Sequence, residues 1–362
     1  MFNLISGAAA AWRQARNIVT WCYPAASRPG DACHSEEFPV KKHKKGAAGH
    51  AVQPDIYRMV TDRILASLAQ GVLPWRKPWR TDGRGQTGLP VNALTGRHYS
   101  GVNVLLLWMA AETGGYPGDA WLTYRQAQEA GGQVRRGETS SLAVVYKDWT
   151  RPAEDENGNR LYDADGQPLK ETVPMLRQLH LFNVAQCDGL PAQMLPADGG
   201  GRPVEEYATV SPQQLAAVQT MLTASGVQLT SLYQDRAYYT PAADRIVMPL
   251  TSQFDSEADY WSTLLHEMVH STGHRSRLDR PGISAPRQKG DAVYALEELV
   301  AETGSAFLCA QLGIYGEVQH ECYIDGWLRV LKADKKALFR ACSKAREATE
   351  YLLGPLNLRP VA

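Results

Sequence analysis

The stretch from Trp261 to Gly273, which reads WSTLLHEMVHSTG, constrains the fold of this chain more than any other. His266 and His270 are four residues apart, so on an α-helix they lie about one turn apart and both imidazoles can reach one metal ion. Glu267 then lies beside that ion, where its carboxylate can act as a base on metal-bound water. The stretch therefore predicts a helix that carries a catalytic metal site.

The apolar residues of the same stretch fit an amphipathic helix. They recur at the spacing of one buried stripe, while the two histidines project from roughly the opposite side. The stripe consists of Trp261, Leu264, Leu265, Met268 and Val269. Asp255 or Ser256 can cap the start of this helix, and Gly273 lies where a left-handed residue is expected to end it.

A third metal ligand has to come from elsewhere, and residues 291–313 form the best source. They predict a second amphipathic helix on which Glu298 and Glu302 share one face, four residues apart. We expect Glu298 to bind the metal and Glu302 to orient a histidine through its second ring nitrogen. The exchange of these two roles, or a simple solvated acidic face, is the alternative.

These two helices resemble the zincin metallopeptidases of the HExxH-plus-Glu type. Within that resemblance the sequence EELVAE, residues 297–302, matches the glutamate helix and favours Glu298 as the ligand. The resemblance implies Zn²⁺ as the cofactor. The extended metzincin signature requires histidine at position 276, where this chain has Ser276, so that subfamily is excluded.

Charge divides the chain into two parts. The 362 residues have a net charge of zero, but residues 1–150 contain 18 Lys and Arg against 11 Asp and Glu, or +7, which leaves −7 for the remainder. This division predicts a basic N-terminal part that meets a polyanion and an acidic C-terminal part that does not. A composition of 44% hydrophobic and 21% charged residues is typical of a soluble globular protein.

Cysteine usage and hydropathy predict a cytoplasmic location and no membrane partner. The six cysteines lack C-x-x-C spacing, which indicates neither a zinc knuckle nor a disulfide framework and favours a reducing compartment. No run approaches the 18 or more apolar residues that span a membrane. No basic residue precedes the short apolar run near the N-terminus, so a signal peptide is not predicted.

The segment PWRKPWR, residues 74–80, is the clearest candidate for contact with nucleic acid. Trp75 and Trp79 can stack on unpaired bases while neighbouring cations follow the phosphates. The alternative is a pair of structural tryptophans that anchor a loop. The other predicted DNA-binding residues are Arg76, Lys77, Arg80, Arg97, Tyr99, Asn103, Arg135 and Arg136.

These patterns predict an α+β chain of two domains. Residues 1–53 are expected to be a disordered extension, residues 54–190 an α/β domain, and the Pro- and Gly-rich residues 191–210 a linker. Residues 211–362 are expected to form a mainly helical domain with a small sheet, in which a strand at 246–248 borders the metal cleft. Strands at 142–149 and 176–184 are joined by a solvated hairpin extension.

Six motifs in a fixed order resemble the plasmid-encoded ArdC antirestriction proteins. They are PWRKPW at 74–79, GRHYSGVN at 96–103, WLTYRQA at 121–127, VRRGE at 134–138, LFNVAQ at 181–186 and HEMVHSTGHRSRLDR at 266–280. The resemblance implies an N-terminal single-stranded-DNA-binding domain, also found in TraC-type conjugative primases, joined to a zincin-like metallopeptidase domain. The first fifty residues have no counterpart in it.

The combined hypothesis is a plasmid-type antirestriction protein that binds single-stranded DNA nonspecifically and carries a zinc metallopeptidase domain, with a protein or peptide as a second partner. One alternative is a dedicated zinc protease that its basic domain recruits to DNA. Another is a DNA-binding protein whose metal is purely structural.

Overall fold

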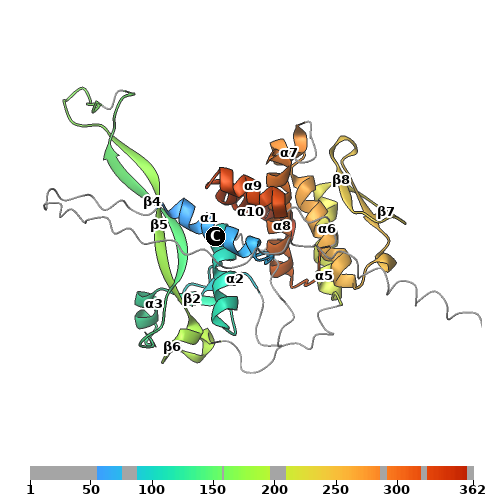
Figure 1. Ribbon diagram of the computed structural model, residues 1–362, viewed down its shortest axis with the longest axis horizontal. Helices are drawn as coiled ribbons and strands as arrows, with labels where there is room; N and C mark the ends of the chain where they lie inside the picture. Colours follow the sequence, from blue (N-terminus) through green and yellow to red (C-terminus); the bar gives the residue numbers. More distant parts are fainter. Residues whose placement is uncertain are drawn as a thin grey trace, which may run out of the picture. The chain divides into compact units, whose positions relative to one another are not determined.

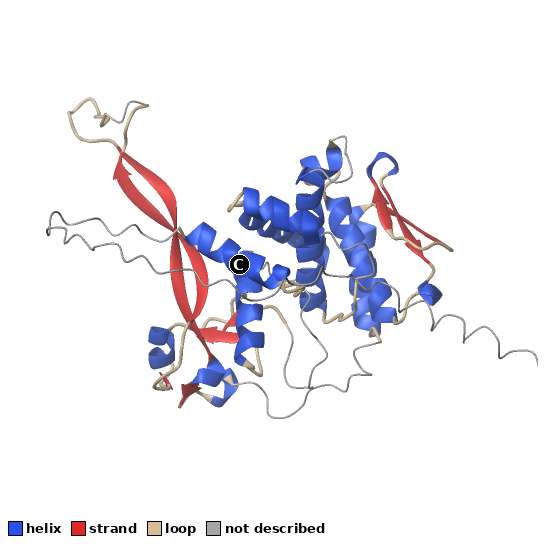
Figure 2. Ribbon diagram, viewed as in Figure 1, coloured by secondary structure: helices blue, strands red, loops and turns tan. Residues whose placement is uncertain are grey.

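The computed structural model describes residues 55–75, 88–156, 159–195, 209–285, 292–318 and 324–356. All of them belong to one compact unit, Gln53–Ala362. The predicted extension at residues 1–53 lies outside the described residues. The order of the elements and their secondary structure can be followed in Figures 1 and 2.

In the part that the structure describes, the N-terminal half combines a four-stranded sheet with three α-helices. Its elements are α1 (Ile56–Ala69), β1 (Val91–Asn92), α2 (Val102–Gly114), β2 (Ala120–Leu122), α3 (Tyr124–Glu129), β3 (Gln133–Val134), β4 (Ser141–Pro152), β5 (Lys170–Asn183) and β6 (Cys187–Asp188). The sheet has the order β1-β2-β5-β4, and β3 pairs with β6 separately. β1 and β2 are parallel, whereas β5 is antiparallel to both of its neighbours.

Local sequence explains the two long N-terminal helices. The side chain of Asp55 accepts a hydrogen bond from the Arg58 amide and caps α1, which buries one stripe that includes Ile64. α2 is apolar around most of its circumference because it is enclosed on several sides. It packs against β4 and against α10 (Ala337–Leu353).

Strands β4 and β5 form a ribbon that is much longer than the rest of the sheet. Twelve residue pairs join them, from Ser141 opposite Leu181 to Pro152 opposite Lys170. Figure 1 shows the twisted ribbon continuing beyond β2. The predicted strands and hairpin extension are therefore present, and both strands extend further along the hairpin than predicted.

The C-terminal half is mainly helical with one small sheet. Its elements are α5 (Pro212–Ser225), β7 (Gln228–Leu232), β8 (Tyr238–Thr240), β9 (Arg245–Pro249), α6 (Glu257–Thr272), α7 (Pro281–Ser284), α8 (Ala292–Leu312), α9 (Ile324–Ala333) and α10. The sheet has the order β7-β9-β8. The predicted strand at 246–248 is thus central and not at the cleft edge, because β7 and β8 occupy both of its sides. β8 is an edge strand of this sheet.

Helix α6 is the predicted histidine helix, and α8 is the predicted glutamate helix. Ser256 caps α6 through the Asp259 amide, as expected. Gly273 does not end α6 in the left-handed conformation, since its φ is −76°. A Cβ atom at Gly273 would lie 2.5 Å from Cγ1 of Ile283, so this glycine permits the close approach of α7.

The two halves share one apolar core. A single cluster contains Val60, Trp75 and Trp108 from the N-terminal half together with Phe307 and Trp327 from the C-terminal half. The rings of Trp75 and Trp327 meet edge to face at 5.1 Å between centroids, and those of Trp108 and Phe307 meet at 6.1 Å. Among the described residues, no helix has the length and apolar character needed to cross a membrane.

Candidate metal centre and nucleic-acid residues

The three predicted metal ligands come together in the structure. His266 and His270 lie on α6 and Glu298 on α8, and all three side chains are buried. Oε2 of Glu298 is 3.6 Å from Nε2 of each histidine. Their ligand atoms all lie within 4.8 Å of one another. The spacing predicted from sequence is therefore realised between two helices that pack together.

This arrangement fits a divalent metal ion. Ligand atoms on a tetrahedral ion with bonds of about 2.0–2.2 Å are about 3.3–3.6 Å apart, close to the separations between Glu298 and the histidines. Two imidazoles and one carboxylate are ligands that Zn²⁺ and similar transition metals accept. Three protein ligands leave one tetrahedral position for water or substrate.

The electrostatics of the centre favour positive charge. Burial by itself lowers the pKa of His270, but the carboxylates of Glu298 and Glu297 outweigh burial and raise that pKa to about 10. Burial raises the pKa of Glu298, and the facing imidazoles of His270 and His266 outweigh it and hold that pKa well below its usual range. A cation at this point is therefore stabilised by its surroundings.

Glu267 directly follows His266 and is 4% exposed. Its charge also contributes to the raised pKa of His270, which places its carboxylate within electrostatic range of the centre. A carboxylate next to, but outside, the group of ligand residues has the position that a general base requires.

Two buried residues that sequence reasoning missed support the histidines. Oε1 of Glu297 lies 3.3 Å from Nδ1 of His270, on the ring edge opposite the predicted metal-binding nitrogen. Arg280 donates to both carboxylate oxygens of Glu297, at 2.6 Å from Nη2 and 3.0 Å from Nε. Arg280 also donates to Oγ1 of Thr272 and to the carbonyl of Val269 near the end of α6. The signals for these residues were the doubled glutamate at 297–298 and the arginine that closes the motif at 280.

Glu302 lies on α8 one turn beyond Glu298 and is 2% exposed. The carboxylate in contact with the second nitrogen of His270 is that of Glu297. The predicted role of Glu302 beside a histidine stays a prediction.

A second charge network, which is half-buried, fixes the loop that follows α6. Arg277 forms an ion pair with Asp244, which precedes β9 and has a φ of 45°. The hydroxyl of Tyr239 on β8 donates to the same carboxylate at 2.8 Å. Arg277 also donates to the carbonyl of Ser271 at 2.7 Å, so it ties the sheet to the end of the histidine helix.

Two of the predicted DNA-binding residues are used structurally. Trp75 is 1% exposed and is enclosed against Trp327, so the prediction that its ring stacks on bases is wrong. Asn103 donates from Nδ2 to the carbonyl of Val144 and accepts the Val144 amide at Oδ1, both at 2.8 Å. These bonds tie Asn103 to the backbone of β4, an edge strand, and its predicted DNA contact stays a prediction.

The remaining predicted DNA-binding residues differ in their exposure and in their hydrogen-bond and ion-pair partners. Arg97 and Arg136 are exposed. Tyr99 is half-buried, and its hydroxyl accepts from Asn92. Arg135 is paired with Glu138 and with a second carboxylate, that of Asp188, which reduces its attraction for phosphate. The other four, Arg76, Lys77, Trp79 and Arg80, lie outside the described residues.

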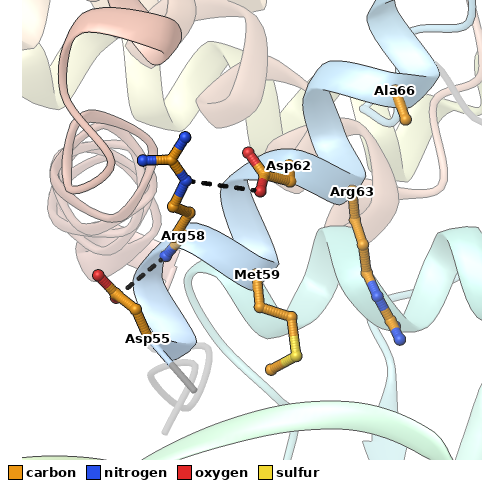
Figure 3. Close-up of a pocket in the computed structure, with 6 residues that line it drawn as sticks. All are labelled: Asp55, Arg58, Met59, Asp62, Arg63 and Ala66. Carbon is orange, nitrogen blue, oxygen red and sulfur yellow. Dashed lines mark hydrogen bonds and ion pairs between the residues drawn. The ribbon is translucent and has the colours of Figure 1, made fainter. Parts of the chain in front are cut away.

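A hollow on α1 shares no residue with the candidate metal centre or the predicted DNA-binding set. It is an open hollow of about 520 Å³ on one face of α1, lined by Asp55, Arg58, Met59, Asp62, Arg63 and Ala66. Figure 3 shows that Arg58 turns toward Asp62 while Arg63 extends away from that pair. Arg58 and Asp62 form an exposed ion pair at 3.9 Å, which has little stabilising effect.

Both halves of the chain match known protein families. Residues 54–182 match the family described as the N-terminal domain of anti-restriction factor ArdC, and residues 216–344 match the family of zincin-like metallopeptidases. The uncharacterised protein y4eC of Sinorhizobium fredii is 35% identical over 301 residues, which cover 82% of this chain and 91% of that protein.

Solved structures and longer relatives extend the match. A crystal structure of the antirestriction protein ArdC from plasmid R388 in metal-free form is 38% identical, with a TM-score of 0.67, and the match covers 84% of this chain and 99% of that one. Its Mn(II)-bound form gives 37% identity and a TM-score of 0.63, over 84% and 100% of the two chains. Two Escherichia coli proteins named DNA primase TraC are 34% and 35% identical over 82% and 83% of this chain. The chain spans only 20% and 27% of their length.

The fold and the buried site thus define a two-domain protein with a zincin-like C-terminal half. The chain belongs to the ArdC family of antirestriction proteins.

Proposed function

We propose that this antirestriction protein binds single-stranded DNA nonspecifically through its N-terminal domain and binds Zn²⁺ at a peptidase-type centre in its C-terminal domain. The observation that carries the proposal is the buried group His266, His270 and Glu298, with Glu267 adjoining it. The Mn(II)-bound form of the R388 relative supports a divalent ion, and membership in a zincin-like family supports zinc. We propose domain boundaries at 54–190 and 211–362, with residues 191–210 as the connection.

The side chains of the centre have distinct roles in this proposal. A divalent ion supplies Lewis acidity there, which makes water more acidic and polarises a peptide carbonyl. His266, His270 and Glu298 hold the ion. Glu267 accepts a proton from the attacking water and returns it to the leaving amine. Burial of these groups keeps bulk water away and strengthens each charge interaction.

DNA binding is proposed from charge and from the relatives. Residues 1–150 have an excess of seven positive charges, of which residues 1–53 contribute four, whereas residues 54–190 contain 15 Lys and Arg against 15 Asp and Glu. Binding of phosphates by the N-terminal domain without sequence preference therefore depends on where its cations gather on the surface. The TraC relatives, which are named as DNA primases, match across this same region, and the family of residues 54–182 is an antirestriction domain. Among the described residues of the predicted set, the exposed cations are Arg97, Arg135 and Arg136, of which Arg135 is paired with two carboxylates.

Metal quantification together with a strand-binding assay tests the proposal. The wild type should contain one zinc and retard an unpaired oligonucleotide. Glu267→Gln should keep the metal and lose any peptidase activity, while Glu298→Ala should lose the metal. Glu302→Ala should weaken zinc affinity by only about 10–100-fold if Glu302 supports a ligand.

The same measurements separate the alternative functions. Zinc without peptidase activity on casein, combined with unchanged DNA binding in His266→Ala, favours a structural metal. Strong peptidase activity that DNA stimulates favours a recruited protease. Absence of zinc and of other divalent ions from the wild type would contradict the proposed centre, and equal affinity for duplex and single strands would contradict the proposed strand preference.

A further inference from the structure

The β4–β5 ribbon has two faces with different surroundings. Because residues that face each other across the ladder share a face, Ala143 and Leu179 mark one face and Leu142 and His180 the other. The Leu142 face continues toward α1, where the hydroxyl groups of Tyr146 and Tyr57 are 3.0 Å apart. The Ala143 face is buried only at its base, in a small cluster with residues of α2 and β2.

Beyond its buried base, the Ala143 face presents cations around an exposed indole. Its residues in order along the ribbon are Val145 opposite Arg177, Lys147 opposite Met175, Trp149 opposite Val173, and Arg151 opposite Glu171. Trp149 is 44% exposed, because a two-stranded ribbon has no core in which its ring could be buried. We name this surface, residues Lys147, Trp149, Arg151, Glu171, Val173, Met175 and Arg177, the ribbon face.

The contacts on the ribbon face keep the ring in a defined position. The guanidinium of Arg151 lies 5.9 Å from the centroid of the Trp149 ring and also pairs with Glu171 at 2.7 Å. Arg177 lies beside Met175, with its Nη2 3.9 Å from the thioether sulfur. The ribbon face thus has three cations and one carboxylate, a net charge of +2.

The other parts of the ribbon do not share this character. The opposite face has one cation, Lys170, and one carboxylate, Asp148, on the same exposed length. The described residues beyond Pro152, at the far end of the hairpin, include five carboxylates and one arginine. The opposite face also has an exposed aromatic ring, that of Tyr146, and the far end of the hairpin has that of Tyr162, but neither region has a net positive charge. Within the described ribbon, net positive charge and an exposed aromatic ring therefore occur together on the ribbon face, a combination that fits a single-stranded polyanion with unpaired bases.

We propose that the ribbon face binds single-stranded DNA, with Trp149 stacking on a base while Lys147 and Arg177, which both lie between Trp149 and the base of the ribbon, contact phosphates on that side. This inference deepens the proposed function and rests on it. It assigns base stacking to a residue outside the motifs expected for that role, and it follows the finding that Trp75 is enclosed. Stacking on an indole together with phosphate contacts is the usual mode of sequence-tolerant single-strand binding.

The test measures fluorescence anisotropy of a labelled dT oligonucleotide with the full-length protein. A length of about 20 nucleotides exceeds the about 4–16 nucleotides that one single-strand-binding domain covers. Trp149→Ala should weaken binding by about 5–150-fold, and Trp149→Phe should recover most of the loss because it retains a stacking ring. Lys147→Ala and Arg177→Ala should each reduce the slope of log affinity against log salt by about 0.7.

Lys170→Ala is the matched control, because it removes one exposed positive charge at the same ribbon from the opposite face. It should leave the salt slope unchanged. Circular dichroism and the unfolding temperature of each variant verify that the ribbon is folded. The Phe variant and the two cation variants keep the proposal testable even if Trp149→Ala unfolds.

Each outcome supports or overturns a separate statement. Wild-type protein that fails to bind dT would overturn the proposed function and this inference together. Wild-type binding that Trp149→Ala leaves unchanged would overturn the ribbon face alone and preserve the proposed function. Equal effects of Lys147→Ala and Lys170→Ala would also overturn the ribbon face, as would tighter binding of the matching duplex.

Discussion

The pair of Arg280 and Glu297 provides the sharpest test of how the metal centre is held. Both side chains are 4% exposed, and their charges balance each other in the interior. Arg280→Met keeps a side chain of similar length but leaves the Glu297 carboxylate with His270 as its remaining hydrogen-bond partner among the described residues. Breaking a buried ion pair from one side costs about 3–5 kcal/mol in the free energy of unfolding.

The double variant Arg280→Met with Glu297→Met separates this cost from packing. It leaves no buried charge from the pair, and the main remaining penalty is the lost acceptor of His270 Nδ1, about 1–3 kcal/mol. We therefore expect the double variant to be more stable than Arg280→Met alone, by about 2 kcal/mol. Adding Glu297→Met to Arg280→Met should therefore restore part of the lost stability, whereas two independent contacts would predict a further loss.

Urea unfolding of the metal-free protein in the presence of a chelator gives the required free energies. Chelation matters because metal binding adds its own stabilisation to the folded state. Zinc affinity is then measured separately on the same proteins. The double variant should bind zinc about 10–100-fold more weakly than the wild type despite its recovered stability, because nothing orients the His270 ring.

Three results would refute this reasoning. A double variant that is less stable than Arg280→Met would mean that the two charges are not energetically coupled. Unchanged zinc affinity in the double variant would mean that Glu297 has no positioning effect on His270. A cost below about 1 kcal/mol for Arg280→Met would mean that this buried pair stabilises the fold no more than an exposed ion pair does.

Three further predictions follow from other contacts. Burial raises the pKa of Asp244, but Arg277 outweighs burial and lowers that pKa below 3.8. The ion pair therefore stabilises the fold above pH 3.8, and its contribution is lost as the pH falls. Between about pH 5 and pH 3, Asp244→Asn should lose less free energy of unfolding than the wild type does, as measured by urea unfolding at both pH values. Asn103→Ala should cost about 1–3 kcal/mol by urea unfolding, because it leaves the amide and carbonyl of Val144 without their partner. A fragment of residues 54–190 should lack the sharp calorimetric transition of residues 54–362, because truncation exposes the fragment's part of the shared core. A sharp transition in the fragment would count against a core that both halves need.

Sequence patterns predicted which side chains meet at the centre, because their positions depend on spacing along a helix. The positions of His266, His270 and Glu298 follow from helical geometry, and the donors lie within 4.8 Å of one another in the structure. Glu297 escaped prediction because its partner Arg280 is seventeen residues away along the chain and joins it only when α7 packs on α8. A pairing of this kind has no local periodicity to reveal it.

Predictions of surface function failed where tertiary packing overrides local composition. Tryptophan between prolines and cations is compatible with either a stacking surface or an anchor, and only the position of Trp327 on α9 decides that Trp75 is an anchor. Asn103 appears as a free polar side chain in a turn-rich motif until β4 is placed beside α2. Trp149 lies in a stretch whose sequence indicated only a strand, and its exposure depends on the ribbon extending past the sheet.

The shared core also explains which part of the chain recurs in its relatives. Glu298 lies in the first half of α8, and Phe307 in the second half of the same helix packs on Trp108 of α2. A ligand that stabilises the contact of α6 with α8 therefore also stabilises the N-terminal half, to the extent that the two halves unfold together. The matches to the TraC primases cover 82% and 83% of this chain but a small part of those proteins. The segment that recurs within the longer chains thus includes both halves, as expected when neither half completes its core without the other.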